Sequence, residues 1–527
     1  MNEEKRRQLW HAENRHRVLR LRGYRAPAAM VREATAARLA GDWRAACAAA
    51  MVDVDLDPAE VCADLAGFAP DFLRLHLPYV SQLAGQSWVP EQLALRPGAQ
   101  VVLSRHDGPL QPGTPVLVAT LPPHDQAAQR LRLRVADIGD LRGPWYDMPA
   151  WTWHADAVAE RRWAYGASEQ RLPWHFPDGS PYPVTASTPA GAEPGRAADF
   201  ERMAARYGDR AAQYRQAGFT VADRSSSSAS WRLDQYAPAL PLLAAETRRL
   251  SHRYAAMGLT SLLSPDRDAE LSGSTLTVLD GERERRWSGR LPVEAERTGP
   301  VAFGVVAPDD VDLLRWDWLQ PGDLHPLALE ALFPRGEHRW GPPSHDAYER
   351  VRVRCEGVWH EVEVTGAALA LPSHDPAGLT AATASAGAGA GCARALSGFR
   401  SGAPPVPRDL RGARRRLFDR AFHGDTAAVL ADLHAGADPQ VRDGRGRTLL
   451  HWAGHVDHTR VLPLLLTAGF SPHDRAEDGR TPLHTAAAAW AGSPDVPPVL
   501  AALIAAGADP EALDARGLTA AQVLHAG

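Results

Sequence analysis

The sequence predicts a multidomain α+β body followed by an all-α solenoid of repeats. In the last fifth of the chain, helical segments recur with a period of 33 residues, as between Thr448 and Thr481, which is typical of stacked helical repeats. The first four fifths alternate helical patterns with short strands and hairpins. Because hairpins dominate there over strand–helix–strand units, an α+β arrangement is favoured over a parallel sheet.

Length and composition are those of a soluble protein with several domains. The chain has 527 residues, of which 45% are apolar and 23% are charged. A net charge of only -5 creates no strong field toward nucleic acid or anionic membranes, so we expect neither as a partner. No apolar stretch is long enough to span a bilayer, and no signal-peptide core follows the polar N-terminal residues. A cytoplasmic location is therefore expected.

The cysteine spacing and the absence of catalytic motifs favour a protein without a cofactor. The four cysteines are too scattered for a disulfide framework and lack the paired spacing of zinc motifs. They are Cys47, Cys62, Cys355 and Cys392. The sequence contains neither a Gly-Lys-Ser/Thr phosphate loop nor a Gly-x-Ser-x-Gly nucleophile elbow. We therefore predict no cofactor, no metal and no catalytic residue.

Two markers in the C-terminal region recur in one register. The segment Thr448–Ala453, with the sequence TLLHWA, returns as TPLHTA at Thr481–Ala486. An Ala-Gly pair follows each leucine-rich helix: Ala435-Gly436 returns in the same register at Ala468-Gly469, and again at Ala506-Gly507 after a few extra residues. Asp-Gly or related turns separate the units. On these motifs, residues 411–527 resemble the ankyrin-repeat family. The resemblance implies a short solenoid that binds another protein.

The repeated residues have structural roles in this interpretation. Threonine caps the first helix of a repeat, and proline suits the first helical position, where an N–H is not needed. Glycine ends the second helix at a positive φ. The resemblance implies that the histidine of the motif bonds across neighbouring loops. The motif residues are Thr448, His451, Gly469, Thr481, Pro482, His484 and Gly507.

The repeats depart from the family pattern at several points. Leu449 replaces the usual proline, and Asp457 stands where the family usually has a glycine between the helices. Residues 491–498 lengthen the connection inside the last full repeat. The first unit, 414–442, lacks the Thr-x-Leu-His motif, and the last, 517–527, has only a first helix. Degenerate end units are expected, because one face of each end repeat meets solvent.

The resemblance also implies where a partner would bind. In ankyrin repeats, the turn tips and the exposed first-helix positions contact the partner. By position these are Arg445, Arg447, Trp452, His455, Arg480, Thr485 and Ala488. Trp452 is the strongest candidate, since an exposed tryptophan near arginines suits an interaction hot spot. The alternative is that Trp452 packs against the region before the repeats.

The body shows no resemblance to a family, but its composition divides it into segments. Hydrophobic periodicity and turn signals predict its individual elements. The expected domains are a helical region over residues 1–95, a β-rich region with a tryptophan cluster over 96–190, an α+β region with hairpins over 198–375, and an Ala/Gly/Pro-rich linker over 376–410 that leads into the repeats of 411–527. The main expected elements are helices at 28–39, 43–51, 57–65, 156–163, 198–218 and 239–257, strands at 101–104, 116–121, 131–135 and 300–307, and hairpins at 274–287 and 351–364, the second followed by a strand at 369–371.

Several local patterns in the body resemble functional motifs weakly. The glycines of 387–391 have the wrong spacing for a dinucleotide loop, so a linker is favoured. His360 lacks the second histidine of a zinc helix, and the pairs His154 with Asp156 and His374 with Asp375 are of a kind that arises by chance. The tryptophans around Trp151 could form an exposed stacking surface, but a buried core between a helix and a sheet is favoured.

The sequence therefore favours a non-catalytic adaptor that recruits or docks another protein through its repeats. A rival hypothesis is an enzyme or toxin-like effector, whose body holds a site that no linear motif reveals and whose repeats select targets. A third is a sensor body that binds a small ligand at the tryptophan cluster. A pocket lined by Trp153, His154 and distant acidic residues would favour the enzyme, whereas a flat exposed aromatic patch would favour a binding role.

Overall fold

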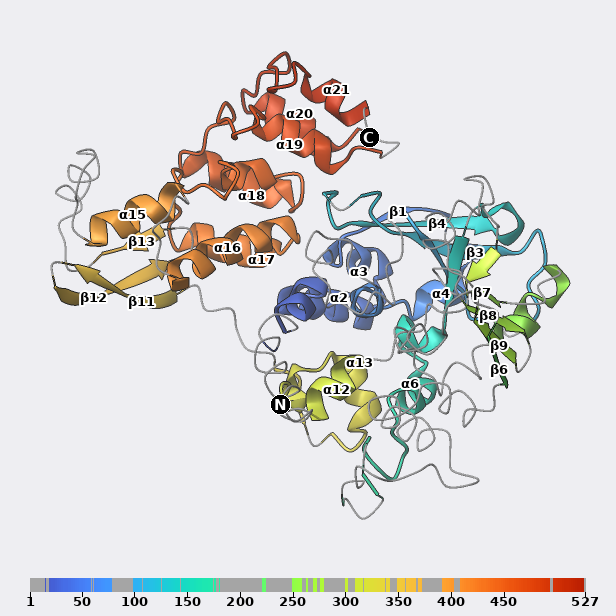
Figure 1. Ribbon diagram of the computed structural model, residues 1–527. Coiled ribbons are helices and arrows are strands. Elements are labelled where there is room, and N and C mark those ends of the chain that lie inside the picture. The colour runs from blue at the N-terminus through green and yellow to red at the C-terminus, as the bar shows by residue number, and fades with distance from the viewer. Residues whose placement is uncertain are drawn as a thin grey trace. The chain divides into compact units, whose positions relative to one another are not determined.

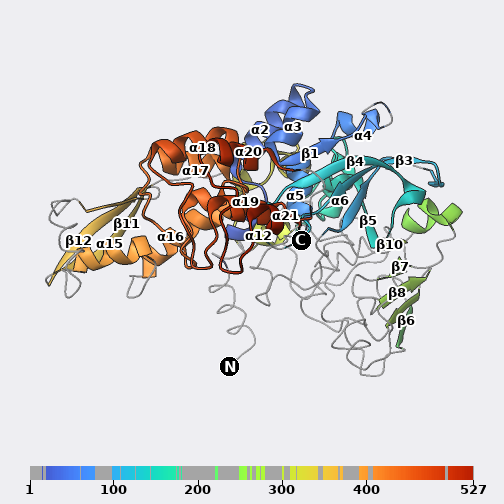
Figure 2. The same ribbon diagram turned by 90° about the horizontal axis from the view of Figure 1, so that it is seen from above.

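The protein is described from a computed structural model, shown in two views (Figures 1 and 2). It describes residues 19–77, 98–180, 309–371, 391–401 and 408–525, each with brief gaps, together with short segments between 220 and 301. The chain forms two compact units. The first comprises Met1–Pro122 and Arg130–Pro343, and the second comprises Pro123–Gln129 and Ser344–Gly527.

A mixed sheet organises the N-terminal unit. Its ten strands among the described residues lie in the order β1-β4-β3-β2-β5-β10-β7-β8-β9-β6. Strands β2, β3 and β4 form an antiparallel meander, whereas β1 pairs parallel with β4 and β5 pairs parallel with both β2 and β10. The strands are β1 Val52–Asp55, β2 Gln100–Leu103, β3 Pro115–Thr120, β4 Leu131–Asp137, β5 Pro144–Met148, β6 Thr220–Asp223, β7 Leu262–Leu263, β8 Ala269–Ser272, β9 Thr275–Val278 and β10 Gly299–Val301.

Short helices pack around this sheet. They are α2 Ala28–Leu39, α3 Trp43–Ala49, α4 Cys62–Ala66, α5 Pro70–His76, α6 Val158–Ala164, α12 Asp309–Arg315 and α13 Pro326–Leu332. Helix α5 joins two apolar cores, because Leu73 packs with α2 to α4 and the sheet while Phe72 packs with α6, α12 and α13. The mixture of helices and hairpins confirms the predicted α+β class of the body.

Most expected elements of the body are present where the chain is described. The helices at 28–39 and 43–51 and the three strands between 101 and 135 are confirmed. The helix expected from Asp57 instead begins at Cys62, and the Asp57 carboxylate accepts the N–H of Ala59 in a local turn before it. The helix at 198–218 and most of the helix expected at 239–257 lie outside the described residues. The hairpin expected at 274–287 is wrong, because its first strand, β9, pairs instead with β8 on one side and β6 on the other. Strand β1 and helix α5 were not predicted.

The tryptophan cluster is part of the core, as the favoured alternative proposed. Trp145, Trp151 and Trp153 are buried, and the indole N–H of Trp153 donates to the carbonyl of Met148 at 3.1 Å. Trp163, on α6, is the exception, with 47% of its surface exposed. The described part of the cluster therefore forms no flat aromatic surface for stacking.

The C-terminal unit begins with a small antiparallel sheet and continues into stacked helices. The hairpin and third strand expected between 351 and 371 are confirmed as β11 Tyr348–Cys355, β12 Val358–Thr365 and β13 Ala368–Ala370. The helical elements that follow are α15 Gly391–Ser401, α16 Arg408–Phe422, α17 Thr426–His434, the 3-10 turn η8 Leu449–Trp452, α18 His458–Thr467, α19 Pro482–Ala489, α20 Pro498–Ala505 and α21 Ala520–His525. In both views the sheet and α15 lie at the α16 end of the stack (Figures 1 and 2).

One continuous apolar core runs from this sheet into the helices. Val353 and Val362 of the sheet and Phe399 of α15 belong to the same buried cluster as Leu450 and Leu483. Helix α15 lies inside the segment expected to be a linker, residues 376–410, and it buries a complete face. Within that segment, residues 391–401 are therefore a packed helix, and residues 376–390 and 402–407 lie outside the described part of the chain.

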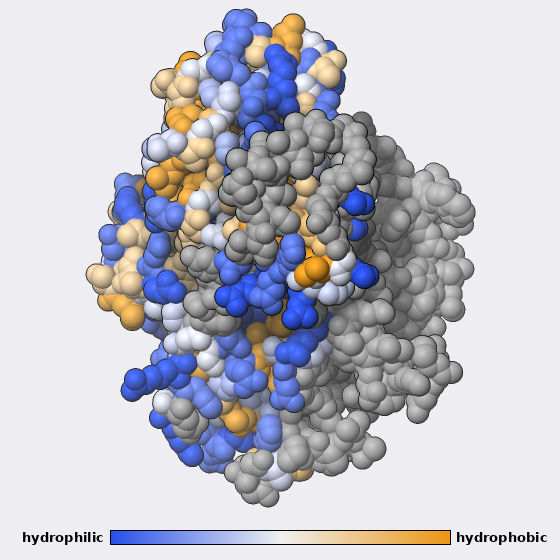
Figure 3. Space-filling view, turned by 90° about the vertical axis from the view of Figure 1, so that its left-hand side faces the viewer, coloured by the Kyte–Doolittle hydropathy of each residue, from blue (hydrophilic) through white to orange (hydrophobic). Residues whose placement is uncertain are grey.

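None of the described helices is long and apolar enough to cross a membrane. On the face of the molecule in Figure 3, hydrophilic and apolar residues are interspersed over the coloured part of the surface.

Replacement of two tryptophans tests the assignment of the aromatic cluster to the core. Trp153→Ala should lower the free energy of unfolding by roughly 3–5 kcal/mol, because the residue is fully buried and the change leaves a large cavity. Trp163→Ala, at an exposed position, should cost less than about 1 kcal/mol. Urea unfolding of both variants measures the difference, and equal costs would contradict the assignment.

Candidate protein-binding surface

The stacked helices are joined by turns that share one backbone geometry. At the base of each turn an N–H donates to the carbonyl four residues later: Asp443 to Arg447, Ala476 to Arg480 and Asp514 to Leu518, each at 2.9 Å. Neighbouring turns are also bonded to one another, because the N–H of Glu477 donates to the carbonyl of Arg445 and that of Ala515 to Asp478. The three turns therefore form a short ladder along one edge of the stack.

Carboxylates close two of these turns. The Asp443 side chain accepts the backbone N–H groups of Arg445 and Arg447 at 2.8 and 3.0 Å, and it also accepts Arg447 Nε at 2.7 Å. Asp514 likewise accepts the N–H groups of Arg516 and Leu518. Such bonds to a carboxylate are stronger than bonds between neutral groups, so the conformations of these two turns are well fixed.

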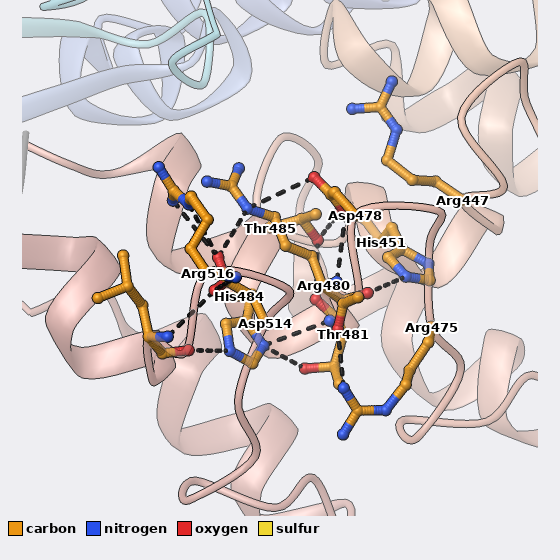
Figure 4. A network of polar contacts seen from close by, with 12 residues as sticks. Arg447, His451, Arg475, Asp478, Arg480, Thr481, His484, Thr485, Asp514 and Arg516 are labelled. Carbon is orange, nitrogen blue, oxygen red and sulfur yellow. Dashed lines mark hydrogen bonds and ion pairs between the residues drawn. The ribbon is translucent and has the colours of Figure 1, made fainter.

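A buried histidine in each repeat connects it to the next one. His451 Nδ1 accepts the N–H of Thr448 at 3.0 Å, while His451 Nε2 donates to the carbonyl of Arg480 at 3.2 Å. The second copy repeats this arrangement, since His484 Nδ1 lies 3.3 Å from the N–H of Thr481 and His484 Nε2 lies 3.0 Å from the carbonyl of Leu518. Figure 4 shows this polar network. In the structure both histidines therefore bridge from their own repeat to the following loop.

The other motif residues lie at the ends of the repeat helices. Pro482 occupies the first turn of α19, and the side chains of Thr448 and Thr481 contact the histidine three residues later at 2.9 Å. Gly469 and Gly507 end α18 and α20 with φ values of 89° and 98°. A positive φ of this size is costly for any other residue, which explains the glycines.

One departure from the family pattern has a clear structural reason. Asp457, which stands in the place of a glycine, precedes α18 and accepts the N–H of Thr459 at 3.1 Å. An aspartate at this position satisfies a backbone donor that would otherwise lack a partner. Asp425 does the same before α17, where it accepts the N–H of Ala428.

The first helices of neighbouring repeats approach closely. The Thr485 hydroxyl donates to the carbonyl of His451 at 2.7 Å, and the indole N–H of Trp490 donates to the carbonyl of Gly454 at 3.0 Å. A Cβ atom at Gly454 would lie only 3.0 Å from the Cα atom of Ala486, so a larger residue there would push the two helices apart by a few tenths of an ångström. The helices thus form a tightly bonded array.

The seven residues predicted to bind a partner fall into two groups. Arg445 is exposed on its turn, and Arg447, Arg480, Thr485 and Ala488 are half-buried. Trp452 and His455 are instead buried, with 6% and 4% of their surface exposed.

The burial of Trp452 favours the alternative in which it packs inside the protein. Its ring packs against Phe422 and His455, with centroids 5.5 and 5.1 Å apart, and the Arg447 guanidinium lies 4.1 Å from its centroid. A tryptophan enclosed in this way contributes to the core between the first two repeats. It is not an exposed anchor for a partner in this structure.

His455 is covered by a segment from far earlier in the chain. Residues 123–129, which precede β4, belong to the C-terminal unit. His455 Nε2 donates to the carbonyl of Gln126 at 3.2 Å, and the N–H of Ala128 donates to the carbonyl of Ala489 at 2.9 Å. This contact could not be predicted from the sequence, because nothing in residues 123–129 resembles the repeats.

The His154–Asp156 pair does not form a reactive site. His154 is buried beneath Gly67, where an added Cβ would lie 2.1 Å from the imidazole, and its Nδ1 accepts the N–H of Asp156. Burial and the nearby Arg105 lower the pKa of His154 to about 4. This neutral, enclosed imidazole has a structural role. His374 and Asp375 lie outside the described residues.

Two buried carboxylates in the N-terminal unit escaped the sequence analysis. Asp147 of β5 accepts a bond from Arg249 at 2.8 Å and contacts the hydroxyl of Tyr254. Asp71 of α5 accepts a bond from His325 Nε2 at 2.8 Å. The partners of each are far apart in sequence, so no linear motif marks them. Their side chains are almost completely closed to solvent, so removal of a partner would leave the carboxylate buried without that partner.

The buried histidines predict a pH-dependent stability of the repeats. Burial lowers the pKa of His451 to about 4 and that of His455 to about 3. Their contribution is complete above the ordinary histidine pKa of about 6.5, because the unfolded chain takes up the protons first as pH falls. It is lost as pH falls toward about 4 for His451 and toward about 3 for His455. The loss from His451 should reach at most about 3 kcal/mol. Urea unfolding of His451→Asn should show a weaker pH dependence than the parent chain over this range, and an identical profile would argue against the assignment.

A second prediction concerns the helix-ending glycines. Gly469→Val should destabilise the repeats by about 1–3 kcal/mol, because a β-branched residue resists the φ of 89°. Gly444→Val is a matched control, since Gly444 has no positive φ and open space around its Cα. Thermal melting compares the two variants. If Gly469→Val melts no earlier than the control, the geometry of this helix end is wrong.

Comparison with known proteins agrees with the geometry of the repeats. The family model for ankyrin repeats, in three copies, matches residues 417–522. No family model accounts for the region before the repeats, and no curated protein matches the chain. Ankyrin repeats generally bind proteins. With its buried histidines, bonded turns and glycine-ended helices, the C-terminal segment 417–522 belongs to the ankyrin-repeat family.

Proposed function

We propose that this chain is a cytoplasmic adaptor that binds another protein through the exposed turns of its ankyrin repeats. The observation that carries the proposal is the ladder of bonded turns, which holds charged side chains outward. The exposed members are Arg445, Glu477, Asp478 and Arg516. All four cysteines are free thiols, which suits a reducing compartment.

The rigidity of the turns supports a role in binding. Each turn is fixed by backbone bonds, and two are closed by buried carboxylates. Because the backbone is already ordered, a partner would lose little conformational entropy on the repeat side when it binds. Fixed charges of both signs also favour recognition of a specific polar surface over nonspecific apolar contact.

The exposure of the side chains indicates which part of the repeats a partner would contact. Trp452 and His455 are buried, whereas the turn side chains are exposed. The turns are therefore the part of the family's usual contact surface that remains open. Arg445 suits a test because its N–H donates to Asp443 and its carbonyl accepts from Glu477, so replacement of its side chain keeps both bonds.

Charge reversal at this turn tests the proposal. Arg445→Glu should weaken binding of a partner captured by the full chain at least about tenfold, because it introduces repulsion where the partner meets the turn. Arg460→Glu, at an exposed arginine on the second helix α18, makes the same change in charge away from the turns and should retain the partner. Quantitative affinity capture followed by titration measures both, with melting curves to show that both variants stay folded.

Removal of the repeats is a second test of whether they bind the partner, and the end point of the shortened chain matters. A chain that ends near residue 401 would expose the apolar face shared by the sheet, α15 and the repeats, so truncation should instead end at Pro343. A partner that binds Arg445→Glu as tightly as the parent chain, or that is retained by the chain ending at Pro343, would place the binding function outside the repeats.

A further inference from the structure

Three potential metal ligands come together at the start of the C-terminal unit. Cys355 ends β11, His360 lies in β12 and Cys392 is in the first turn of α15. One ligand atom of each lies within 4.8 Å of the other two, and the distance from Cys392 Sγ to His360 Nδ1 is 3.4 Å. Both thiols are buried and the imidazole is half-buried. We propose that these three residues bind a zinc ion.

The hairpin itself places the first two ligands together. His360 pairs with Val353, and Cys355 pairs with Val358. Cys355 and His360 are therefore diagonal neighbours on one face of the hairpin, within reach of each other across the strands. The same face carries the buried Val362, so both ligands point toward the side covered by α15.

A glycine brings the third ligand to this face. A Cβ atom at Gly391 would lie 1.9 Å from the carbonyl oxygen of Arg354, which no other residue could tolerate at this position. The first turn of α15 therefore approaches the end of β11 closely, and the next residue is Cys392. This glycine is the last of the Gly-Ala-Gly-Ala-Gly run, whose spacing did not fit a nucleotide site.

The distances and the ligand types fit zinc. With Zn–S near 2.3 Å and Zn–N near 2.0 Å, tetrahedral geometry separates sulfur and nitrogen ligands by about 3.5 Å and two sulfurs by about 3.8 Å. The 3.4 Å between Cys392 and His360 meets this value. Thiolates and imidazole select zinc over the oxygen-seeking Mg²⁺ and Ca²⁺. Among the described residues no other ligand joins the group, so water would complete the coordination.

Simple core packing explains the cysteines only in part. Cys355 and Cys392 both belong to the apolar core, where a free thiol behaves as a small apolar side chain. The imidazole on the same face is hydrogen-bonded to one of the thiols, with His360 Nδ1 3.4 Å from Cys392 Sγ. A metal ion would use the same three side chains as its ligands. Its binding would tie the hairpin to α15, and hence stabilise the end of the core that continues into the repeats.

The test is the metal content and cobalt spectrum of the full chain. Chain purified under reducing conditions should contain one zinc per molecule by elemental analysis. Replacement of zinc by Co²⁺ should give the absorption of tetrahedral coordination together with a thiolate-to-cobalt charge-transfer band. Titration with zinc alone, against a chromogenic chelator, gives the affinity.

Single substitutions identify the ligands. Cys392→Ser and His360→Gln should each weaken zinc binding at least about 100-fold, since loss of even an outer-shell partner of a ligand costs 10–100-fold. Cys62→Ser is the matched control, because Cys62 is an exposed free cysteine outside the group, and it should keep full binding. His360 is half-buried, so His360→Gln keeps the test valid if a buried cysteine variant fails to fold.

Three results would overturn the proposal. The first is a parent chain that neither retains zinc nor takes up Co²⁺ in a thiolate-bound form. The second is zinc binding that persists in His360→Gln and Cys392→Ser, which would place the ion elsewhere. The third is a disulfide between Cys355 and Cys392 in chain kept under reducing conditions.

Discussion

The hydrogen bond from a buried histidine to a carbonyl of the next repeat holds the C-terminal unit together. His451 and His484 each accept a backbone N–H within their own repeat and donate to the following one, at Arg480 and Leu518. This arrangement requires a neutral imidazole with its proton on Nε2, and burial of His451 maintains that state by lowering its pKa. The bonds between neighbouring turns, from Glu477 to Arg445 and from Ala515 to Asp478, keep the same register between repeats.

The ends of such a stack need a cover, because an end repeat has an apolar face without a neighbour. Here β11 to β13 and α15 share one core with the first repeat, and Arg400 of α15 pairs with Asp438 at 2.6 Å. The small sheet thus acts as a cap made from residues that show no repeat pattern. The proposed zinc site lies within this cap, where it would hold the hairpin and the helix in one arrangement.

The sequence predicted what depends on local patterns. Hairpin β11–β12 was predicted from the alternation of apolar and polar residues on both sides of a Glu-Gly turn. The repeat motif predicted where both histidines and Gly469 lie in their repeats. Contacts between distant segments could not be predicted. Two examples are the bond between Asp71 and His325 and the approach of Cys392 to Cys355. In both, the residues next to the contact in the sequence form no motif that would indicate it. Strand β1 is an intermediate case, since Val52–Asp55 alternates but is too short to stand out.

In this chain, one part of the surface that ankyrin repeats usually use for binding is exposed and another part is covered. Its turn side chains are exposed, while the ends of its first helices bond to residues 123–129 through His455 and Ala489. A partner that used those helix ends would first have to displace this segment and break two hydrogen bonds, each worth about 1 kcal/mol net. It would also have to expose the buried His455. A partner that uses the turns meets no such cost, because Arg445 and Glu477 are bound within the protein through their backbones. The energetic difference between these two surfaces therefore favours recognition at the turns.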